Sequence, residues 1–225
     1  MLDAYIQSYN EAVFDTDKQA ALDVVNKALS EGLSPEDVVF KLVIPAVEAM
    51  MARIEKNPDA NLAQHFMTAQ IAADVTEKML AKFSSPPEVI GRVVIGAAYG
   101  DLHSLGKRIV IGCLKSMMVA VTDLGTNVSA EHFVEAAVAE GAQVIAVSAM
   151  MVHTATGDRG SRRVRALLRE RGLENSIKLA VGGAPYRFDP ELYVKVGADA
   201  WAPDGVTAAK AIVQLIREVK AHDAT

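Results

Sequence analysis

The sequence predicts a mixed α/β chain in which an N-terminal antiparallel four-helix bundle precedes a five-stranded, doubly wound parallel sheet. Apolar residues recur at helical spacing throughout residues 2–83. Serines and prolines then interrupt this pattern at residues 84–87, as is typical of a linker. Beyond them, short apolar runs alternate with helical segments. We therefore expect two domains, residues 1–86 and residues 87–225.

Capping and stop signals divide the N-terminal part into the helices of a small bundle. Asp17 lies in an N-cap segment, and Gly32 ends the helix that follows it. Ser34 and Pro35 supply an N-cap and a first-turn proline for the third helix, which Pro45 should bend. The expected spans are Leu2 to Val13, Ala21 to Leu29 with its flanks, Pro35 to Ile54, and Asn61 to Lys82.

The C-terminal part alternates strands with helices, and right-handed crossovers then leave few arrangements other than a flavodoxin-like (Rossmann-like) sheet. The expected strands are Arg92 to Ala98, Met118 to Asp123, Gln143 to Ser148, Lys178 to Val181 and Asp199 to Trp201. The expected helices are Leu105 to Ser116, Ala130 to Glu140, Gly160 to Arg171, Pro190 to Val196 and Val206 to His222.

Composition narrows the classes of function. The formal net charge of −5 gives no general attraction to nucleic acid or to an anionic membrane, so we expect neither as a partner. The single cysteine, Cys113, excludes an internal disulfide framework and suits a reducing compartment; its spacing places it in the core. The N-terminus lacks the pattern of a signal peptide, and we expect a cytoplasmic protein.

The loop after the first expected strand carries the strongest chemical signal. Asp101 lies two residues before His103, with Gly100 and Gly106 on either side. Ligands of open α/β sheets bind outside the carboxyl ends of the strands, which is where this loop must lie. Taken alone, however, these residues equally describe a tight turn with a solvated histidine and no ligand.

Two further loops at the same edge of the expected sheet add support. Ser148-Ala149-Met150 follows the third strand, with Thr154 shortly after it, and Gly182-Gly183-Ala184-Pro185 follows the fourth. Singly, a serine at a strand end usually bonds a local backbone group, and a Gly-Gly pair usually marks a turn. Three such elements in order on three loops argue for one shared site.

The ordered set Asp-x-His-x-x-Gly, Ser-x-Met and Gly-Gly, preceded by a helical bundle, resembles the cobalamin-binding module of corrinoid proteins and of cobalamin-dependent methionine synthase. Lys107, Asp123-Leu124-Gly125 and Gly197-Ala198-Asp199 fit the same resemblance. It covers the whole chain and implies cobalamin, in a methylcobalamin or hydroxocobalamin state, bound base-off and His-on. A plain flavodoxin-like domain without cobalamin is the remaining alternative.

The resemblance implies roles for individual residues. His103 would bind cobalt through Nε2, Asp101 would accept the hydrogen bond from Nδ1, and Thr154 would support that carboxylate. The implied cofactor-binding residues are Asp101, Leu102, His103, Ser104, Leu105, Gly106, Ser148, Met150, Thr154, Gly182, Gly183, Ala184 and Asp204, with Leu62, His65 and Phe66 from the bundle. Two departures are Met150, where the family has leucine, and a longer segment before Gly182 that includes residues 156–160.

The bundle would cover the upper face of the corrin. Leu62, Phe66 and Met67 are the apolar candidates for shielding cobalt, although methionine and phenylalanine at this spacing equally fit the bundle core. Gln64-His65-Phe66 resembles the cap of adenosylcobalamin light sensors with Gln for Glu, and their cap tryptophan is missing near Ile54. We therefore do not expect a photoreceptor.

The function implied is that of a corrinoid protein that carries a methyl group between two partner methyltransferases, one specific for the methyl donor and one for the acceptor. A reductive activator is a further candidate partner, and the sequence leaves open a homo-oligomer and whether the chain is itself an enzyme. The alternative is a stand-alone cobalamin sensor, storage or delivery protein. His65 is its best support, because an imidazole above cobalt could bind the metal or its ligand.

Two features stay outside this scheme. Six arginines gather on one expected helix and its approach, where a solvated face is the first expectation and an acidic partner the second. They are Arg159, Arg162, Arg163, Arg165, Arg169 and Arg171. Trp201, at the end of the last strand, could flank the pocket for the nucleotide tail or pack in the core.

Overall fold

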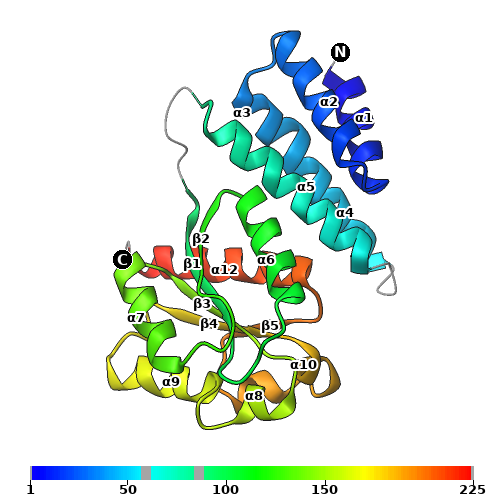
Figure 1. Ribbon diagram of the computed structural model, residues 1–225. Coiled ribbons are helices and arrows are strands. Elements are labelled where there is room, and N and C mark those ends of the chain that lie inside the picture. The colour runs from blue at the N-terminus through cyan, green and yellow to red at the C-terminus, as the bar shows by residue number, and fades with distance from the viewer. Residues whose placement is uncertain (1, 57–61, 84–88, 224–225) are drawn as a thin grey trace. The chain divides into compact units, whose positions relative to one another are not determined.

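The computed structural model describes residues 2–56, 62–83 and 89–223, which form two compact units (Figure 1). One unit comprises residues 1–88 and 115–118, and the other comprises residues 89–114 and 119–225. We call them the helical unit and the sheet unit. The predicted linker at residues 84–87, and with it the predicted domain boundary, lies outside the described residues.

The helical unit follows the predicted caps. Asp17 accepts a hydrogen bond from Ala20 N–H, and Ser34 accepts one from Asp37 N–H, so each begins its helix as an N-cap. Side chains of the last helix of this unit satisfy carbonyls at the end of the first, because Gln64 donates to Phe14 O at 2.5 Å and Thr68 to Val13 O at 3.2 Å. The helical spans are α1 Leu2–Phe14, α2 Lys18–Ser30, α3 Pro35–Asp37, η1 Val38–Val43, α4 Ile44–Lys56 and α5 Leu62–Leu80.

The predicted third helix is continuous from α3 to α4, but its middle differs from expectation. Segment η1 is π-helical and ends two residues before Pro45. Proline has no N–H to donate to the preceding turn, and a widened turn is one way in which a helix accommodates it. The structure thus has a π-helical segment next to Pro45, where the sequence predicted a bend.

The sheet unit confirms the predicted flavodoxin-like architecture. In the described part of the chain, five parallel strands are arranged in the order β2-β1-β3-β4-β5. Their bounds are β1 Gly91–Ala97, β2 Val119–Asp123, β3 Val144–Ser148, β4 Lys178–Gly182 and β5 Ala200–Ala202. Ala97 pairs with Ser148, Ser148 with Gly182, and Gly182 with Ala202, so four strands end at one level. The loops that follow them therefore leave the sheet side by side.

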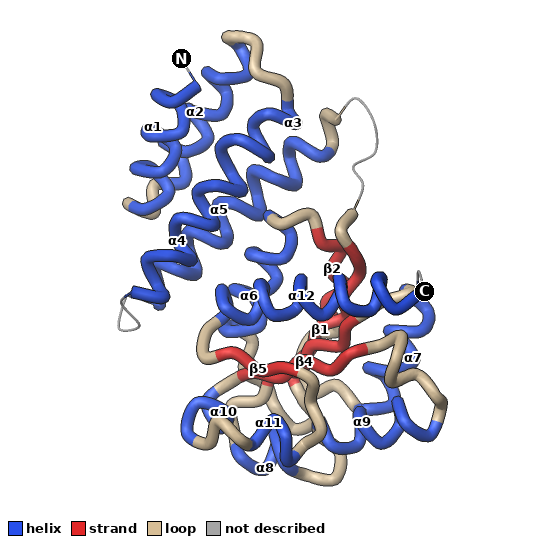
Figure 2. Tube along the Cα trace, turned by 180° about the vertical axis from the view of Figure 1, so that it is seen from behind, coloured by secondary structure: helices blue, strands red, loops and turns tan. Residues whose placement is uncertain are grey.

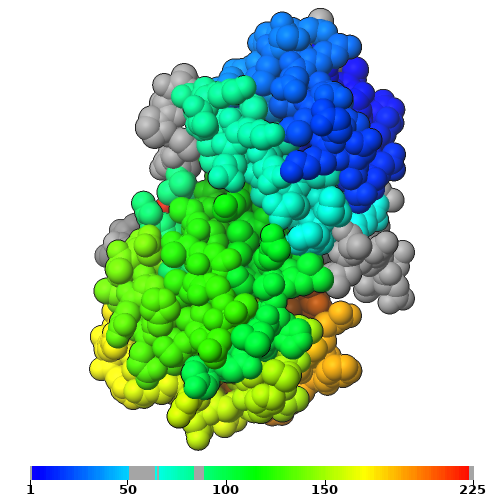
Figure 3. Space-filling model, in the orientation of Figure 1, coloured from blue at the N-terminus to red at the C-terminus, as the bar shows by residue number. Residues whose placement is uncertain are grey.

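Helices cover both faces of this sheet, with α6 and α12 on one face and α7 and α9 on the other (Figure 2). The bounds are α6 Leu105–Ser116, α7 Ala130–Glu140, α8 Val152–Thr156, α9 Ser161–Glu170, α10 Ala184–Phe188, α11 Leu192–Lys195 and α12 Gly205–Asp223. The sequence did not predict α8 and α10, because five residues are too few to show a helical period. In the space-filling view, the green surface of α7 adjoins the yellow surface of α9 (Figure 3).

The core of the sheet unit settles three sequence expectations. Cys113 is buried, as predicted, and burial raises the pKa of its thiol to about 12. Trp201 packs, partly buried, against the apolar core cluster. The expectation of a solvated arginine face is wrong for Arg165, which is 6% exposed.

The reason for the burial of Arg165 is a set of acceptors that are distant in sequence. Its guanidinium donates to Asp199 Oδ2 and to Gly197 O, each at 2.5 Å, and to Glu174 Oε1 at 3.4 Å. Arg163 likewise pairs with Glu131 and Glu170. This part of the basic run is therefore neutralised within the chain itself.

In the described residues, no helix is both long and apolar enough to cross a membrane.

Candidate functional site

Asp101 is the centre of the candidate site, in the loop between β1 and α6. Its side chain has no solvent-exposed surface and accepts four hydrogen bonds. Oδ1 accepts from the backbone N–H of His103 at 3.0 Å and lies 2.8 Å from His103 Nδ1. Oδ2 accepts from Met150 N–H at 2.6 Å and from Thr154 Oγ1 at 2.9 Å. The carboxylate thus connects the loop after β1 to the segment after β3.

These hydrogen bonds determine the charge of Asp101. Burial raises the pKa of the carboxyl, but the bonds from Met150 N–H, from the backbone and ring of His103 and from Thr154 outweigh burial. The pKa of Asp101 is therefore below its ordinary value. A buried, ionised carboxylate consequently lies beside the imidazole.

His103 has one ring nitrogen occupied and one available. Because ionised Asp101 can only accept, Nδ1 of the neutral ring carries the proton, and Nε2 carries the lone pair. The side chain is 58% exposed. The geometry therefore presents a nitrogen lone pair at the carboxyl end of the sheet, of the kind that can bind a metal, with its tautomer set by the carboxylate.

Thr154 lies on α8, the short helix that the sequence did not predict. It is buried, and its hydroxyl lies 2.9 Å from Asp101 Oδ2 and 2.8 Å from Met151 O. A hydroxyl has one proton, so Thr154 can donate to only one of these acceptors at a time. The structure therefore brings together all three residues that were predicted as catalytic: Asp101, His103 and Thr154.

Of three glycines near the carboxyl ends of the strands, one is required by the chain's own packing and two are not. At Gly183, whose φ is +121°, a Cβ would lie 1.9 Å from Ala149 O, so the chain's own packing requires glycine. At Gly106 and Gly182, a Cβ would meet no atom within 4 Å. Internal packing therefore does not explain Gly106 and Gly182, and a side chain at either position would project into open space.

Apolar side chains are exposed on the loops around His103. Those of Leu102, Leu105 and Met150 were predicted as cofactor-binding, and all three are exposed, Leu102 to 74%. Tyr99 and Val152 are exposed on the same two chain segments. Grouped apolar residues at a surface typically mark a binding site, so this edge suits a large, partly apolar ligand.

Of the other predicted contact residues, Asp204 follows β5 and three lie in the helical unit. Asp204 begins α12, accepting from Val206 N–H, Thr207 N–H and the Thr207 hydroxyl at 2.8–2.9 Å. Phe66 is half-buried on α5. Leu62 and His65 are in the same helix, and their side chains lie outside the described ones.

Sequence reasoning missed the residues that brace the loop. Asn127 follows β2; it donates its backbone N–H to Asp101 O at 2.9 Å and accepts from Gly100 N–H through Oδ1 at 2.8 Å. Arg159 donates to the hydroxyl of Tyr99 at 3.0 Å, and its guanidinium lies 5.0 Å from the ring centre. The turn signal Gly125-Thr126-Asn127 was the one hint of the first contact.

Lys107, one helical turn after His103, has a structural role. Its side chain is buried and pairs with Asp123 at the end of β2. Asp123 also accepts from Gly125 N–H at 2.8 Å. The pair therefore fastens the start of α6 to the turn that carries Asn127.

The residues present fit a cobalt corrinoid. In the described residues, no group of three or more His, Cys, Asp or Glu could hold a metal ion alone. A single oriented imidazole instead suits a metal whose other ligands come from a macrocycle. The exposed apolar side chains and the open space at Gly106 and Gly182 suit the bulk of such a macrocycle and its nucleotide tail.

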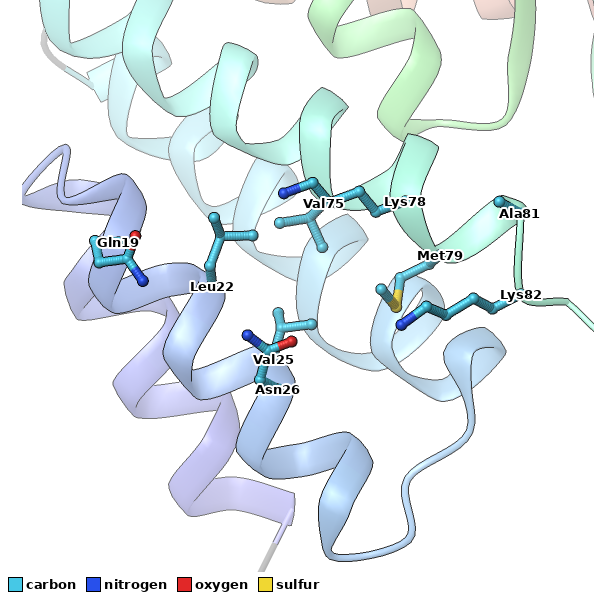
Figure 4. Close-up of a pocket in the computed structure, with 9 residues that line it drawn as sticks. All are labelled: Gln19, Leu22, Val25, Asn26, Val75, Lys78, Met79, Ala81 and Lys82. Carbon is cyan, nitrogen blue, oxygen red and sulfur yellow. The ribbon is translucent and has the colours of Figure 1, made fainter.

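A groove of about 350 Å³ in the helical unit is separate from these residues (Figure 4). It lies between α2 and α5, and Lys78 from α5 and Lys82 from the turn after α5 extend toward α2. Its lining residues are Gln19, Leu22, Val25, Asn26, Val75, Lys78, Met79, Ala81 and Lys82. Among the described residues that line it, none is a predicted site residue.

Comparisons with known protein families match B12 binding domains in both parts of the chain. A B12 binding domain model matches residues 91–213, and a second B12 binding domain model matches residues 5–58. The chain is 32% identical over 215 residues to a dimethylamine corrinoid protein of Methanosarcina barkeri, covering 94% of this chain and 97% of that protein. It is 31% identical to trimethylamine corrinoid protein 1 of Methanosarcina acetivorans, covering 92% and 96%.

Solved structures show the same fold. The methanol:cobalamin methyltransferase complex from Methanosarcina barkeri contains a chain that matches with a TM-score of 0.74 and 23% identity, covering 98% of this chain and 84% of that one. A cobalamin-binding protein from Desulfitobacterium hafniense matches with a TM-score of 0.74 and 20% identity, covering 93% and 98%.

Proposed function

The chain belongs to the family of B12-binding corrinoid proteins, and we propose that it carries a methyl group on a cobalamin whose lower axial ligand is His103. The observation that supports this most directly is the 2.8 Å contact between His103 Nδ1 and the buried Asp101 carboxylate. This contact leaves Nε2 with a lone pair at the exposed edge of the sheet. A base-off, His-on mode requires a nitrogen in this state.

When bound, cobalamin supplies a cobalt centre that accepts a methyl group and gives it up again. Asp101 holds the proton on Nδ1 and so keeps Nε2 free to bind metal. The adjacent Asp101 carboxylate would also hold the His103 ring in one orientation toward the metal. Thr154 keeps the carboxylate in place from the opposite oxygen.

The open glycine positions suit the nucleotide tail that His103 would displace. At Gly106 and Gly182, a side chain would project into space that the chain leaves open. Ser148 ends β3 level with Gly182, so its hydroxyl is a candidate hydrogen-bonding group for the tail. We propose in addition that the helical unit covers the upper face of the corrin, in the role the sequence predicted for it.

The names of the relatives suggest the partners. Two of them are dimethylamine and trimethylamine corrinoid proteins, and a similar fold occurs in a methanol:cobalamin methyltransferase complex. We propose a methyltransferase specific for a small methylated donor as the first partner. A second methyltransferase would pass the methyl group to the acceptor, and a reductive activator would restore oxidised cobalt.

The test is the Co(II) EPR spectrum of the cobalamin-loaded protein, prepared with natural-abundance and with nitrogen-15 histidine. We expect the axial nitrogen splitting to change with the label. We expect His103→Ala to abolish that dependence, and His132→Ala, an exposed histidine on α7, to retain it. A splitting that ignores the label in the unmutated protein would refute the axial-ligand assignment.

A further inference from the structure

Asn127 lies in the turn between β2 and α7 and contacts the candidate ligand loop in two places. Its Oδ1 accepts from Gly100 N–H at 2.8 Å, and its own N–H donates to Asp101 O at 2.9 Å. Between these groups, Asp101 N–H donates to Ala98 O at 2.9 Å. Three successive peptide groups around Asp101 are therefore fixed, two of them by one residue.

The conformation of Asn127 itself is unusual. Its φ is +57°, in the left-handed region that asparagine tolerates better than most residues other than glycine. Contacts on both sides hold the turn there, because Ala97 N–H donates to Gly125 O and Val128 N–H donates to Ala97 O, each at 3.0 Å. Val128 also forms a parallel bridge with Ala98. The end of β1 thus holds the turn that contains Asn127, and Asn127 holds the loop that contains Asp101.

The backbone at residues 100–102 decides where the carboxylate of Asp101 lies. One of its oxygens must reach His103 Nδ1, while the other reaches Met150 N–H and Thr154 Oγ1 across the site. A rotation of the peptide before or after Asp101 would move all of these contacts together. We propose that Asn127 is a positioning residue that holds the Asp101 peptide so that the carboxylate can orient the imidazole.

This proposal extends the proposed function, because orientation of the ring matters to the extent that His103 binds cobalt. Asn127 is exposed and belongs to no core cluster, so its replacement should alter the loop without unfolding the chain. Its two hydrogen bonds are of ordinary strength. Losing the side-chain bond should therefore change a local equilibrium about fivefold.

Two variants separate the side-chain contact from the backbone conformation. Asn127→Gly keeps the left-handed backbone accessible and removes the acceptor, whereas Asn127→Asp keeps the acceptor. Thr16→Gly is the matched control, because Thr16 has a φ of +59° in the helical unit and its replacement makes the same change of backbone freedom.

The first measurement is amide hydrogen exchange in the cofactor-free protein, read at Met150 and His103, whose N–H groups both donate to Asp101. We expect Asn127→Gly to speed exchange at both sites about fivefold, and Asn127→Asp and Thr16→Gly to leave it unchanged. Unchanged exchange in Asn127→Gly would overturn the proposal. Because no cobalamin is present, this result does not depend on the proposed function.

The second measurement uses hydroxocobalamin and the nitrogen-15 EPR experiment. We expect Asn127→Gly to bind the cofactor about fivefold more weakly and to broaden the axial nitrogen splitting, and Asn127→Asp to restore both. Binding and splitting equal to those of the unmutated protein would also overturn the proposal. If the unmutated protein shows no label-dependent splitting, the proposed function fails, and the exchange result alone still decides the role of Asn127 in the loop.

Discussion

In the sheet unit the buried carboxylate of Asp101 accepts four hydrogen bonds, and buried Arg165 donates to three acceptors. In the helical unit the buried Tyr9 hydroxyl, Asn10 Oδ1 and Thr76 hydroxyl have no hydrogen-bond partner in the described part of the chain. Burial without a partner costs about 1–3 kcal/mol per group, whereas a partnered group holds its neighbours in one geometry. These buried polar groups of the sheet unit therefore fix their neighbours, whereas these three of the helical unit do not.

The largest effect on stability is expected when a glycine at the end of β4 in the sheet unit is replaced. Gly183→Ala should destabilise folding by about 4 kcal/mol or more, because the new Cβ would overlap Ala149 O at a positive φ. Gly182→Ala is the matched control: it should change stability by less than about 1 kcal/mol and instead weaken cobalamin binding. Urea unfolding and cofactor titration separate these effects, and equal stabilities would contradict the assigned packing.

Removing the charge of Asp101 should have the next largest effect. Asp101→Asn should lower the free energy of unfolding by about 2–3 kcal/mol at pH 7, because one amide cannot accept from all four donors. Thr156→Ala, which removes an exposed hydroxyl bonded to Val152 O nearby, is the control and should cost under about 1 kcal/mol.

The difference in unfolding free energy between the unmutated protein and Asp101→Asn should depend on pH. The folded-state pKa of Asp101 lies below its ordinary value of about 3.9, so the ionised carboxylate stabilises the fold above that value. This contribution is lost as the pH falls through the lowered pKa. The gap in stability between the unmutated protein and Asp101→Asn should therefore narrow below about pH 4. A gap that widened in acid would contradict an ionised Asp101.

The helical unit should respond in the opposite direction and by less. Thr76→Val removes a buried hydroxyl without a partner and should raise the free energy of unfolding by about 1 kcal/mol. Thr68→Val is the control, because Thr68 donates to Val13 O, and its loss should destabilise by a similar amount. Equal effects of the two substitutions in denaturant titrations would contradict the difference in hydrogen bonding between Thr76 and Thr68.

The sequence predicted those parts of the fold that local signals encode. The bounds of α7 match because Ser129 caps its start and Gly141, at a φ of +61°, ends it. The burial of Arg165 was not predictable, since its partners Asp199 and Gly197 are more than thirty residues away in sequence. Helix α8 was too short to show a period, although Thr154 within it was predicted to support Asp101.

The candidate site, like the fold, was predicted where its signals are local and missed where its contacts are distant in sequence. The spacing of Asp101 and His103 is local, and it predicted their contact through a resemblance between short motifs. Asn127 braces that contact from the turn after β2, and the turn signal at residues 125–127 does not say that position 127 contacts position 100. Motifs therefore identified the groups of the proposed site, whereas the residues that hold them in place depend on the tertiary fold.

The π-helical segment Val38–Val43 sets the rotational phase of α4, the helix that continues from it. An α-helix advances about 100° per residue, so the extra residue that a π turn contains rotates α4 about its axis by that angle. With this rotation, Ala46, Val47 and Met50 are buried. Deleting one residue from Val38–Val43 would convert this π-helical segment to α-helix and rotate α4 back about its axis. The apolar residues of α4 would then face water.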